Sequence, residues 1–267
     1  RFGGDSLQGR YHYLRLLPFS FHELKASSQK DLKSLMTLGG FPEPFLGGSE
    51  KDAQRWSNEY MARLVRDELT DLEFVSDIGT LEVLARALPS HVGSPLSINN
   101  LRENLQVAHE TVSKWIMMLE RLYLIFRLTP FTGNLIKSIK KEQKLYFFNW
   151  TFVENESLRF ENLIAVHLLK YCYWLEDSEG QRVSLHFTKQ KNAPEIDFVI
   201  CRDNIPFAFI EAKKSDQDIN PHFHYFKKKY PNALFFQVHY QGKKDFISGD
   251  GYRVCPARIF LKEMFLI

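Results

Sequence analysis

Two apolar segments joined by a very short connection place the strongest constraint on how this chain folds. Residues 195–201 and 206–212 are rich in Ile, Val, Phe and Ala and have the composition of β-strands. Parallel strands need a connection of a dozen or more residues, so these two segments must form an antiparallel hairpin. Both segments also carry acidic residues, so the hairpin is at once part of a core sheet and a candidate site.

The length of the hairpin connection decides which acidic residues meet. Side chains two apart on a strand point the same way, so Glu211 and Lys213 share one face. A three-residue connection places Asp197 opposite Phe209, on that same face and diagonal to Glu211. A two-residue connection places Asp197 opposite Ile210 on the other face, and the site is lost unless a bulge restores it.

A third acidic residue lies in the segment from Ser157 to about Tyr173, which is predicted to be a helix with Ser157 as its N-cap. Glu161 shares a face of this helix with Ile164, Ala165 and Leu168. A carboxylate within an apolar stripe needs a cation, a metal ion or a hydrogen-bond donor. The alternative is a glutamate in the first turns that is favoured by the helix dipole.

Together these residue types suggest metal chemistry. Carboxylates from neighbouring strands, here Asp197 and Glu211, are hard oxygen ligands of the kind that Mg²⁺ prefers. Such an ion can stabilise charge on a phosphodiester, and Lys213 can position a nucleophile or offset charge. Glu161 could complete the set. The alternative is an exposed sheet rim with a Glu–Lys pair of little energetic consequence.

The sequence divides into three predicted regions: 1–75, 76–148 and 149–267. The last alternates helix and strand and predicts a compact mixed α/β domain. Its expected strands are 183–187, 195–201, 206–212 and 233–238, and its expected second helix is 220–230.

The middle region predicts a winged helix-turn-helix. Helical segments 98–106 and 111–123 are separated by a four-residue break and followed by apolar strand-like segments, with the wing at 132–143. The polar side of the second helix and the basic wing supply the expected DNA contacts: Thr111, Ser113, Lys114, Lys140 and Lys141. The alternative is a winged helix that joins domains or binds protein.

The first region is helical and interrupted by turn signals, which suggests a small lid-like unit. Residues 51–82 contain 4 basic and 8 acidic residues, a net charge of −4. This part is not expected to touch phosphates, and it raises a further hypothesis of a module that only binds protein.

Composition excludes several classes of protein. With 44% hydrophobic and 25% charged residues the chain is not disordered, and a net charge of +3 does not by itself indicate nucleic-acid binding. Three widely spaced cysteines suggest a reducing compartment. Because no run of 18 uncharged apolar residues occurs, we expect a cytoplasmic protein without a membrane partner.

The acidic residues resemble the pattern of the PD-(D/E)XK nuclease superfamily: an acid on the first helix, an acid on a strand, and Glu-x-Lys on the next strand. Glu161, Asp197 and Glu211-Ala212-Lys213 fill those places, although Pro194-Glu195 stands where the superfamily has Pro-Asp. The resemblance implies a restriction-endonuclease-like fold, Mg²⁺ bound by Asp197 and Glu211, and Lys213 as the catalytic lysine.

The whole chain resembles the region that follows the ATPase core in prokaryotic AAA-type ATPases of unassigned role. The matching segments are Ser6–Arg10, Leu17–Glu23, Gly39–Glu43, Arg66-Asp67, Thr111–Trp115 and Arg159–Asn162. No G-x-x-x-x-G-K-[ST] motif occurs, so ATP is expected only with an upstream core. A first residue other than Met agrees with such a fragment. Arg10 or Arg66 is then either a nucleotide sensor or an ordinary packing arginine.

These observations predict a multi-domain α/β protein that binds DNA through a winged helix and carries a Mg²⁺-dependent nuclease-like domain. The alternative function is an inactive nuclease-like scaffold that binds DNA or protein, with chemistry confined to the ATPase core. Self-association stays open.

Overall fold

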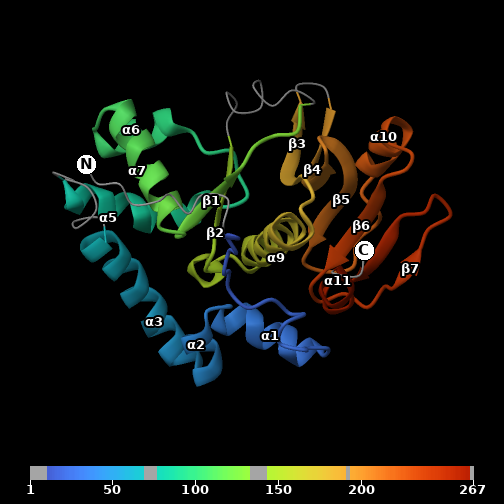
Figure 1. Cartoon of the computed structure of the whole chain (residues 1–267), viewed down its shortest axis with the longest axis horizontal. Coiled ribbons are helices and arrows are strands. Elements are labelled where there is room, and N and C mark those ends of the chain that lie inside the picture. Colours follow the sequence, from blue (N-terminus) through green and yellow to red (C-terminus); the bar gives the residue numbers. More distant parts are fainter. Residues whose placement is uncertain (1–10, 69–76, 133–142, 191–192, 265–267) are drawn as a thin grey trace.

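The computed structural model describes residues 11–68, 77–132, 143–190 and 193–264, which form a mixed α/β structure (Figure 1). A six-stranded sheet occupies the C-terminal part, and a group of helices with a two-stranded sheet occupies the N-terminal part. The expected α/β class is therefore confirmed.

The large sheet has the strand order β3-β4-β5-β6-β8-β7. Its strands are β3 (Val183–Gln190), β4 (Ala193–Arg202), β5 (Ile205–Lys213), β6 (Leu234–His239), β7 (Phe246–Ile247) and β8 (Arg253–Pro256). Strands β3, β4 and β5 are antiparallel, β5, β6 and β8 are parallel, and β7 pairs antiparallel with β8. The four strands expected from the sequence are present, whereas β7 and β8 were not predicted.

Helices cover both faces of this sheet. Helix α10 (His222–Lys229) covers one face, where Phe223 and Phe226 join a cluster with Phe209 and Phe235. Helix α9 (Glu156–Glu179) and the short α11 (Ala257–Glu263) lie on the other face and belong to the main hydrophobic core. The sheet is thus buried on both sides, which explains its strongly apolar strands.

Helix α9 begins earlier and ends later than predicted. The side chain of Asn155 accepts hydrogen bonds from the backbone N–H groups of Ser157 and Leu158, at 3.0 and 3.1 Å. Asn155 is therefore the N-cap, and the prediction of Ser157 in that role is wrong. The helix continues past Tyr173 to Glu179, where Gly180 takes the left-handed conformation that ends it.

The N-terminal part contains a series of helices and one small sheet. Its elements are α1 (Gln29–Leu38), α2 (Pro42–Gly47), α3 (Glu50–Arg63), a π-helical turn (Leu64–Glu68), α5 (Ile78–Ala87), a 3₁₀ turn (Leu88–His91), α6 (Ile98–Leu105), α7 (His109–Arg121), β1 (Ile125–Leu128), β2 (Lys144–Phe147) and a 3₁₀ turn (Trp150–Phe152). The expected wing lies almost entirely outside the described residues.

The amphipathic pattern of residues 111–123 gives α7, which buries Val112, Trp115, Ile116 and Leu119 as its spacing requires. The predicted end was too late. The helix stops at Arg121, and Tyr123 has a φ of +55° and an exposed side chain instead of continuing the buried stripe.

The two parts of the chain share one hydrophobic core that runs from Leu17 to Met264. Polar contacts reinforce it. The buried amide of Asn162 on α9 donates to the Phe147 carbonyl at 2.6 Å and accepts from the Phe147 N–H at 2.9 Å. Trp150 Nε1 donates to the Leu35 carbonyl at 2.9 Å. The boundaries at 75 and 148 stay predictions.

None of the helices in the described part of the chain has the length and apolar character that crossing a bilayer demands. The three cysteines are buried and unpaired. Burial raises the pKa of Cys201 and of Cys255 to about 12, so these thiols stay protonated at neutral pH.

The segment before α1 is attached to α9 through a buried histidine. The N–H of Phe21 donates to Nε2 of His167 at 3.0 Å, so the proton of the neutral ring is on Nδ1, 2.8 Å from the Leu163 carbonyl. Burial lowers the pKa of His167 to about 4. Protonation of Nε2 would remove the acceptor for Phe21.

We expect the protein to lose stability as the pH falls from about 6.5 to 4 because of His167. The unfolded chain takes up a proton near pH 6.5 and the folded chain only near pH 4, which amounts to about 3 kcal/mol. Urea unfolding at pH 7.5 and pH 4.5 should show a smaller pH-dependent loss in His167→Gln than in wild type. Equal losses would contradict this role.

Candidate functional site

The acidic hairpin has a two-residue turn. Arg202 of β4 pairs with Ile205 of β5, which leaves Asp203 and Asn204 as the turn, with φ values of +48° and +63°. Positive φ at both positions is typical of a type I′ turn, and Asp and Asn tolerate it better than most residues. The three-residue alternative is therefore wrong.

A β-bulge next to the turn changes the register. Cys201 pairs with Pro206, but the preceding residue, Ile200, pairs with Ala208. Phe207 is thus an extra residue on β5 with no partner on β4. Its ring lies 3.7 Å from the guanidinium of Arg202.

This bulge brings the two acidic residues together. Beyond it Phe198 pairs with Ile210, so the next step of the ladder places Asp197 beside Glu211. The sequence left two alternatives, and the structure combines the shorter turn with the restoring bulge.

A second irregularity turns Asp197 toward α9. Between β3 and β4 the register shifts by one residue near Asp197 and Phe198. Ile196 and Val199, three apart, consequently both belong to the cluster under α10. Phe198 instead joins the main core and packs against Tyr146, with ring centroids 5.8 Å apart.

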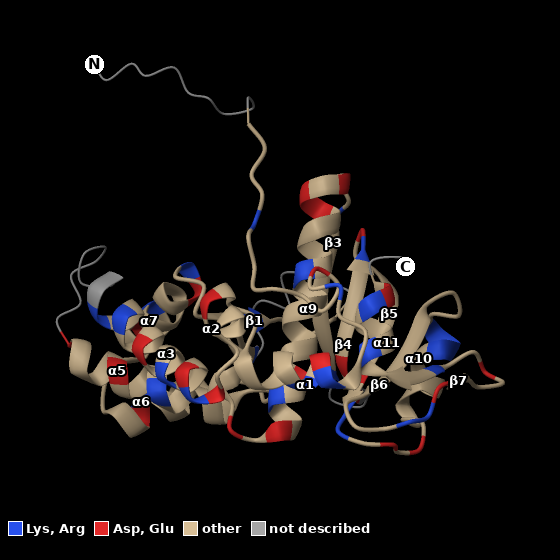
Figure 2. Ribbon diagram, turned by 90° about the horizontal axis from the view of Figure 1, so that it is seen from below, with Lys and Arg blue, Asp and Glu red and all other residues tan. Residues whose placement is uncertain are grey.

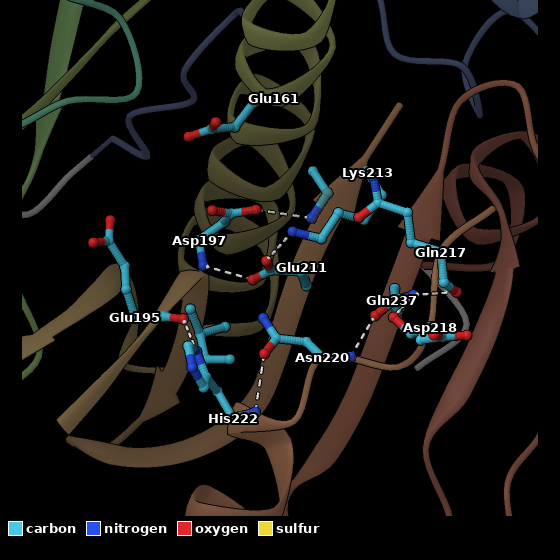
Figure 3. Close-up of polar contacts among 12 residues, drawn as sticks. Glu161, Glu195, Asp197, Glu211, Lys213, Gln217, Asp218, Asn220, His222 and Gln237 are labelled. Carbon is cyan, nitrogen blue, oxygen red and sulfur yellow. Dashed lines mark hydrogen bonds and ion pairs between the residues drawn. The ribbon is translucent and has the colours of Figure 1, made fainter. Parts of the chain in front are cut away.

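Three of the four predicted site residues contact one another (Figure 3). The N–H of Asp197 donates to Glu211 Oε2 at 3.3 Å, and Lys213 Nζ donates to Glu211 Oε1 at 2.6 Å. The N–H of Ala212 donates to Asp197 Oδ2 at 2.9 Å. The hairpin backbone therefore helps to orient both carboxylates.

The fourth residue, Glu161, is bound by the N-terminal part of the chain. Its Oε1 accepts a hydrogen bond from the Tyr146 hydroxyl at 2.8 Å and lies 3.9 Å from Lys144 Nζ. Gly93, with a φ of +73°, lies so close that a Cβ there would be 3.0 Å from the same oxygen. A side chain at position 93 would be strained and crowded.

Lys144 and Tyr146 were not predicted as site residues. Lys144 has a side chain only 3% exposed, and its Nζ forms an ion pair with Glu195 Oε1 at 2.8 Å. Its signal in the sequence is a lysine directly before the apolar residues 145–148, where a buried charge needs an acidic partner. That partner lies 51 positions later, so local sequence could not identify it.

The electrostatics of the cluster reflect buried carboxylates that repel one another. Desolvation, followed by repulsion from Glu161 and Glu211, raises the pKa of Asp197 well above its ordinary value. Desolvation also raises the pKa of Glu161, which Lys144 and Tyr146 partly offset. Burial opposes the charged form of Lys213, but the acidic neighbours outweigh it and raise the pKa of Lys213.

A divalent cation would suit the donor chemistry of this cluster. Glu161, Glu195, Asp197 and Glu211 carry four negative charges when ionised, and Lys144 and Lys213 carry two positive charges, a difference of −2. Within the described ranges, no three or more His, Cys, Asp or Glu side chains are grouped closely enough to hold a metal ion. The hairpin therefore offers an ion at most the two carboxylates of Asp197 and Glu211, because Glu161 is hydrogen-bonded to Tyr146.

Three of the five predicted DNA contacts lie on α7 within the described residues. On α7, Lys114 is exposed and Thr111 and Ser113 are half-exposed, with Ser113 Oγ 3.5 Å from His109 Nδ1. Lys140 and Lys141 lie outside the described residues, as does Arg10. Arg66 forms an ion pair with Glu82.

Comparison with known proteins finds similarity to families without an assigned function. Residues 29–153 match the family described as a domain of unknown function, DUF8612. Residues 158–260, which contain all four predicted site residues, match the domain of unknown function DUF4143. The change from one match to the other falls between β2 and α9, the two elements that meet at Glu161.

Two curated relatives are the uncharacterized protein Rv2008c of Mycobacterium tuberculosis and the uncharacterized protein Mb2031c of Mycobacterium bovis. Each is 24% identical over 142 residues, which is 53% of this chain and 32% of the relative. The chain thus spans about a third of the length of the curated relatives it matches. No solved structure is significantly similar.

The substitution Asp197→Asn is expected to stabilise the fold at pH 8. Since the pKa of Asp197 is raised in the folded state, ionisation destabilises the fold as the pH rises above about 4. Asparagine keeps an oxygen for the Ala212 N–H without the charge. The thermal midpoint at pH 8 should rise by about 2–4 °C or more, and the gain should shrink toward pH 4.

Asp177→Asn is the matched control. Hydrogen bonds from Arg15 hold the pKa of Asp177 below its ordinary value, so this substitution should lower the midpoint at pH 8. A lower midpoint for both variants would show that Asp197 is not under electrostatic strain.

Proposed function

We propose that the chain is part of a DNA-processing protein and carries a divalent-cation-dependent nuclease-like domain in residues 149–267. The observation that carries the proposal is the convergence of Asp197, Glu211 and Lys213, which depends on a turn and a bulge that compensate each other. Without the bulge, Asp197 would lie on the opposite face of the sheet from Glu211.

In this function Asp197 and Glu211 would hold Mg²⁺ or Mn²⁺. The bound ion would supply a Lewis acid that stabilises negative charge on a phosphodiester. Lys213 already binds Glu211 and has its charged form favoured by the cluster. It would remain an ammonium at neutral pH and could orient a phosphate or offset its charge.

A catalytically inactive scaffold is the second candidate function. The observation that favours it is that every carboxylate of the motif already accepts a hydrogen bond. The donors are Tyr146 for Glu161, the Ala212 N–H for Asp197, and Lys213 for Glu211. Carboxylates whose hydrogen bonds are all made within the protein can have a purely structural role.

The DNA-binding part of the proposal rests on residues 76–148 as a winged helix. Helices α6 and α7 are joined by a short turn at Gln106, which has a left-handed conformation, and the β1–β2 ribbon follows. Lys114 projects into solvent from α7. Figure 2 shows further basic residues on α10, whose last turn contains Lys227, Lys228 and Lys229.

Control by an ATPase core outside this chain is the last part of the proposal. The match over residues 158–260 is to a domain found in AAA-ATPase-associated proteins. The curated relatives are about three times longer than the segment that they share with this chain, so they have room for further domains.

Cleavage of single-stranded, duplex and branched DNA with Mg²⁺ or Mn²⁺ tests the nuclease function. We expect Glu211→Gln and Lys213→Met each to lower the cleavage rate by about 100-fold or more, because each removes a charge at the reacting centre. Gel assays under single-turnover conditions would measure the rates.

A neighbouring Glu–Lys pair provides the control. Glu156 and Lys214 form an ion pair at 2.6 Å with both side chains almost half exposed. Glu156→Gln and Lys214→Met should leave cleavage unchanged. Cleavage that survives the loss of Glu211 and Lys213 would place the activity elsewhere, and no cleavage by any form would favour the scaffold.

DNA binding by α7 is tested separately. Lys114→Gln should weaken duplex binding several-fold and reduce the slope of log K against log salt by about 0.9, as expected for one lost phosphate contact. Fluorescence anisotropy between about 50 and 200 mM salt would measure both quantities. Lys51→Gln on α3, which lies at the start of the acidic segment 51–82, should change neither. Identical behaviour of the two variants would exclude α7 as the contact surface.

A further inference from the structure

Lys144 introduces a positive charge into the acidic cluster from outside the hairpin. It is the first residue of β2, and its ammonium forms ion pairs with Glu195 at 2.8 Å and Glu161 at 3.9 Å. With only 3% of its side chain exposed, it is held there by packing and cannot simply turn into solvent.

The two lysines serve different carboxylates. Lys213 binds Glu211, whereas Lys144 binds Glu161 and Glu195. In the described part of the chain, Asp197 takes part in no ion pair, although it lies between the two groups. Asp197 is therefore the carboxylate of the cluster beside which a further cation would be placed.

The total charge agrees with this location. Four ionised carboxylates and two ammonium groups leave −2, which one divalent cation balances and two would overcompensate by +2. Because the Glu195 side chain is 47% exposed, solvent screens part of this charge, and the preference for one ion rests on the two ion pairs of Lys144.

We propose that Lys144 acts as a built-in cation in the Glu161–Glu195 half of the cluster, so that the site binds one divalent ion, at Asp197 and Glu211, rather than two. This inference rests on the proposed function, since it requires that the site binds a metal ion at all. In this role Lys144 determines how many metal ions the site binds. Its ammonium contacts Glu161 and Glu195 and does not contact the substrate.

Counting bound Mn²⁺ by electron paramagnetic resonance tests the proposal on the whole chain without any measurement of activity. Wild type should bind one ion. Lys144→Met removes the charge but keeps a side chain of similar length, and it should bind two ions because Glu161 and Glu195 become free to act as oxygen ligands. Adding Glu195→Gln to Lys144→Met should return the count to one.

Two further variants act as controls. Lys144→Arg keeps the charge and should bind one ion. Lys170 has a side chain that is only 14% exposed and forms an ion pair with the almost half-exposed Glu23 away from the cluster, so Lys170→Met should also bind one ion. If Lys144→Met does not fold, Lys144→Gln replaces it, with folding of every variant checked by circular dichroism.

The outcomes separate this inference from the proposed function. Two ions in wild type, or one ion in the folded Lys144→Met and Lys144→Gln variants, would overturn the role of Lys144 while leaving a metal site. No bound ion in wild type or in the variants would overturn the metal site itself and this inference with it.

Discussion

The burial of α9 is the constraint on which the rest of the structure depends. This helix is 24 residues long, and its middle, residues 162–169, is buried by the large sheet, β2 and the segment before α1, so the polar side chains of Asn162 and His167 are removed from water. A buried polar group without a partner costs free energy of the order of 1–3 kcal/mol. Each such group on α9 therefore requires a specific partner from another element.

Those partners come mostly from the N-terminal part of the chain. Asn162 binds the backbone of Phe147, His167 binds the N–H of Phe21, and Glu161 binds the hydroxyl of Tyr146. The three contacts fix how the two parts are placed. They also explain why one hydrophobic core extends across both, although two different families match them.

The sequence predicted the parts of this fold that depend on local pattern. Alternation and apolar composition were sufficient to predict β3 to β6, and helical spacing was sufficient for the buried stripe of α7. The exact first and last residues of helices were predicted less well, because a few backbone atoms decide them. Asn155 and Ser157 are both good capping residues, and only the backbone geometry favours Asn155.

The register of the acidic hairpin shows a different limit. The length of the turn and the bulge each change the face of the sheet on which Asp197 lies, and the two effects cancel. Residues 202–207 do not reveal a bulge at Phe207, because the stacking of its ring on Arg202 appears only once the strands pair. The sequence could therefore propose that Asp197 and Glu211 meet, but it could not choose between the two registers.

Lys144 and Tyr146 were missed because their partners are distant in the chain and belong to another predicted domain. Division of the chain at residue 148 separates the acids of the cluster from the lysine and tyrosine that bind them. Glu161 would then lose its hydrogen-bond donor, and Glu195 would lose its ion pair. The charge of the acidic cluster is consequently a property of both parts together, and movement of β2 relative to α9 would change it.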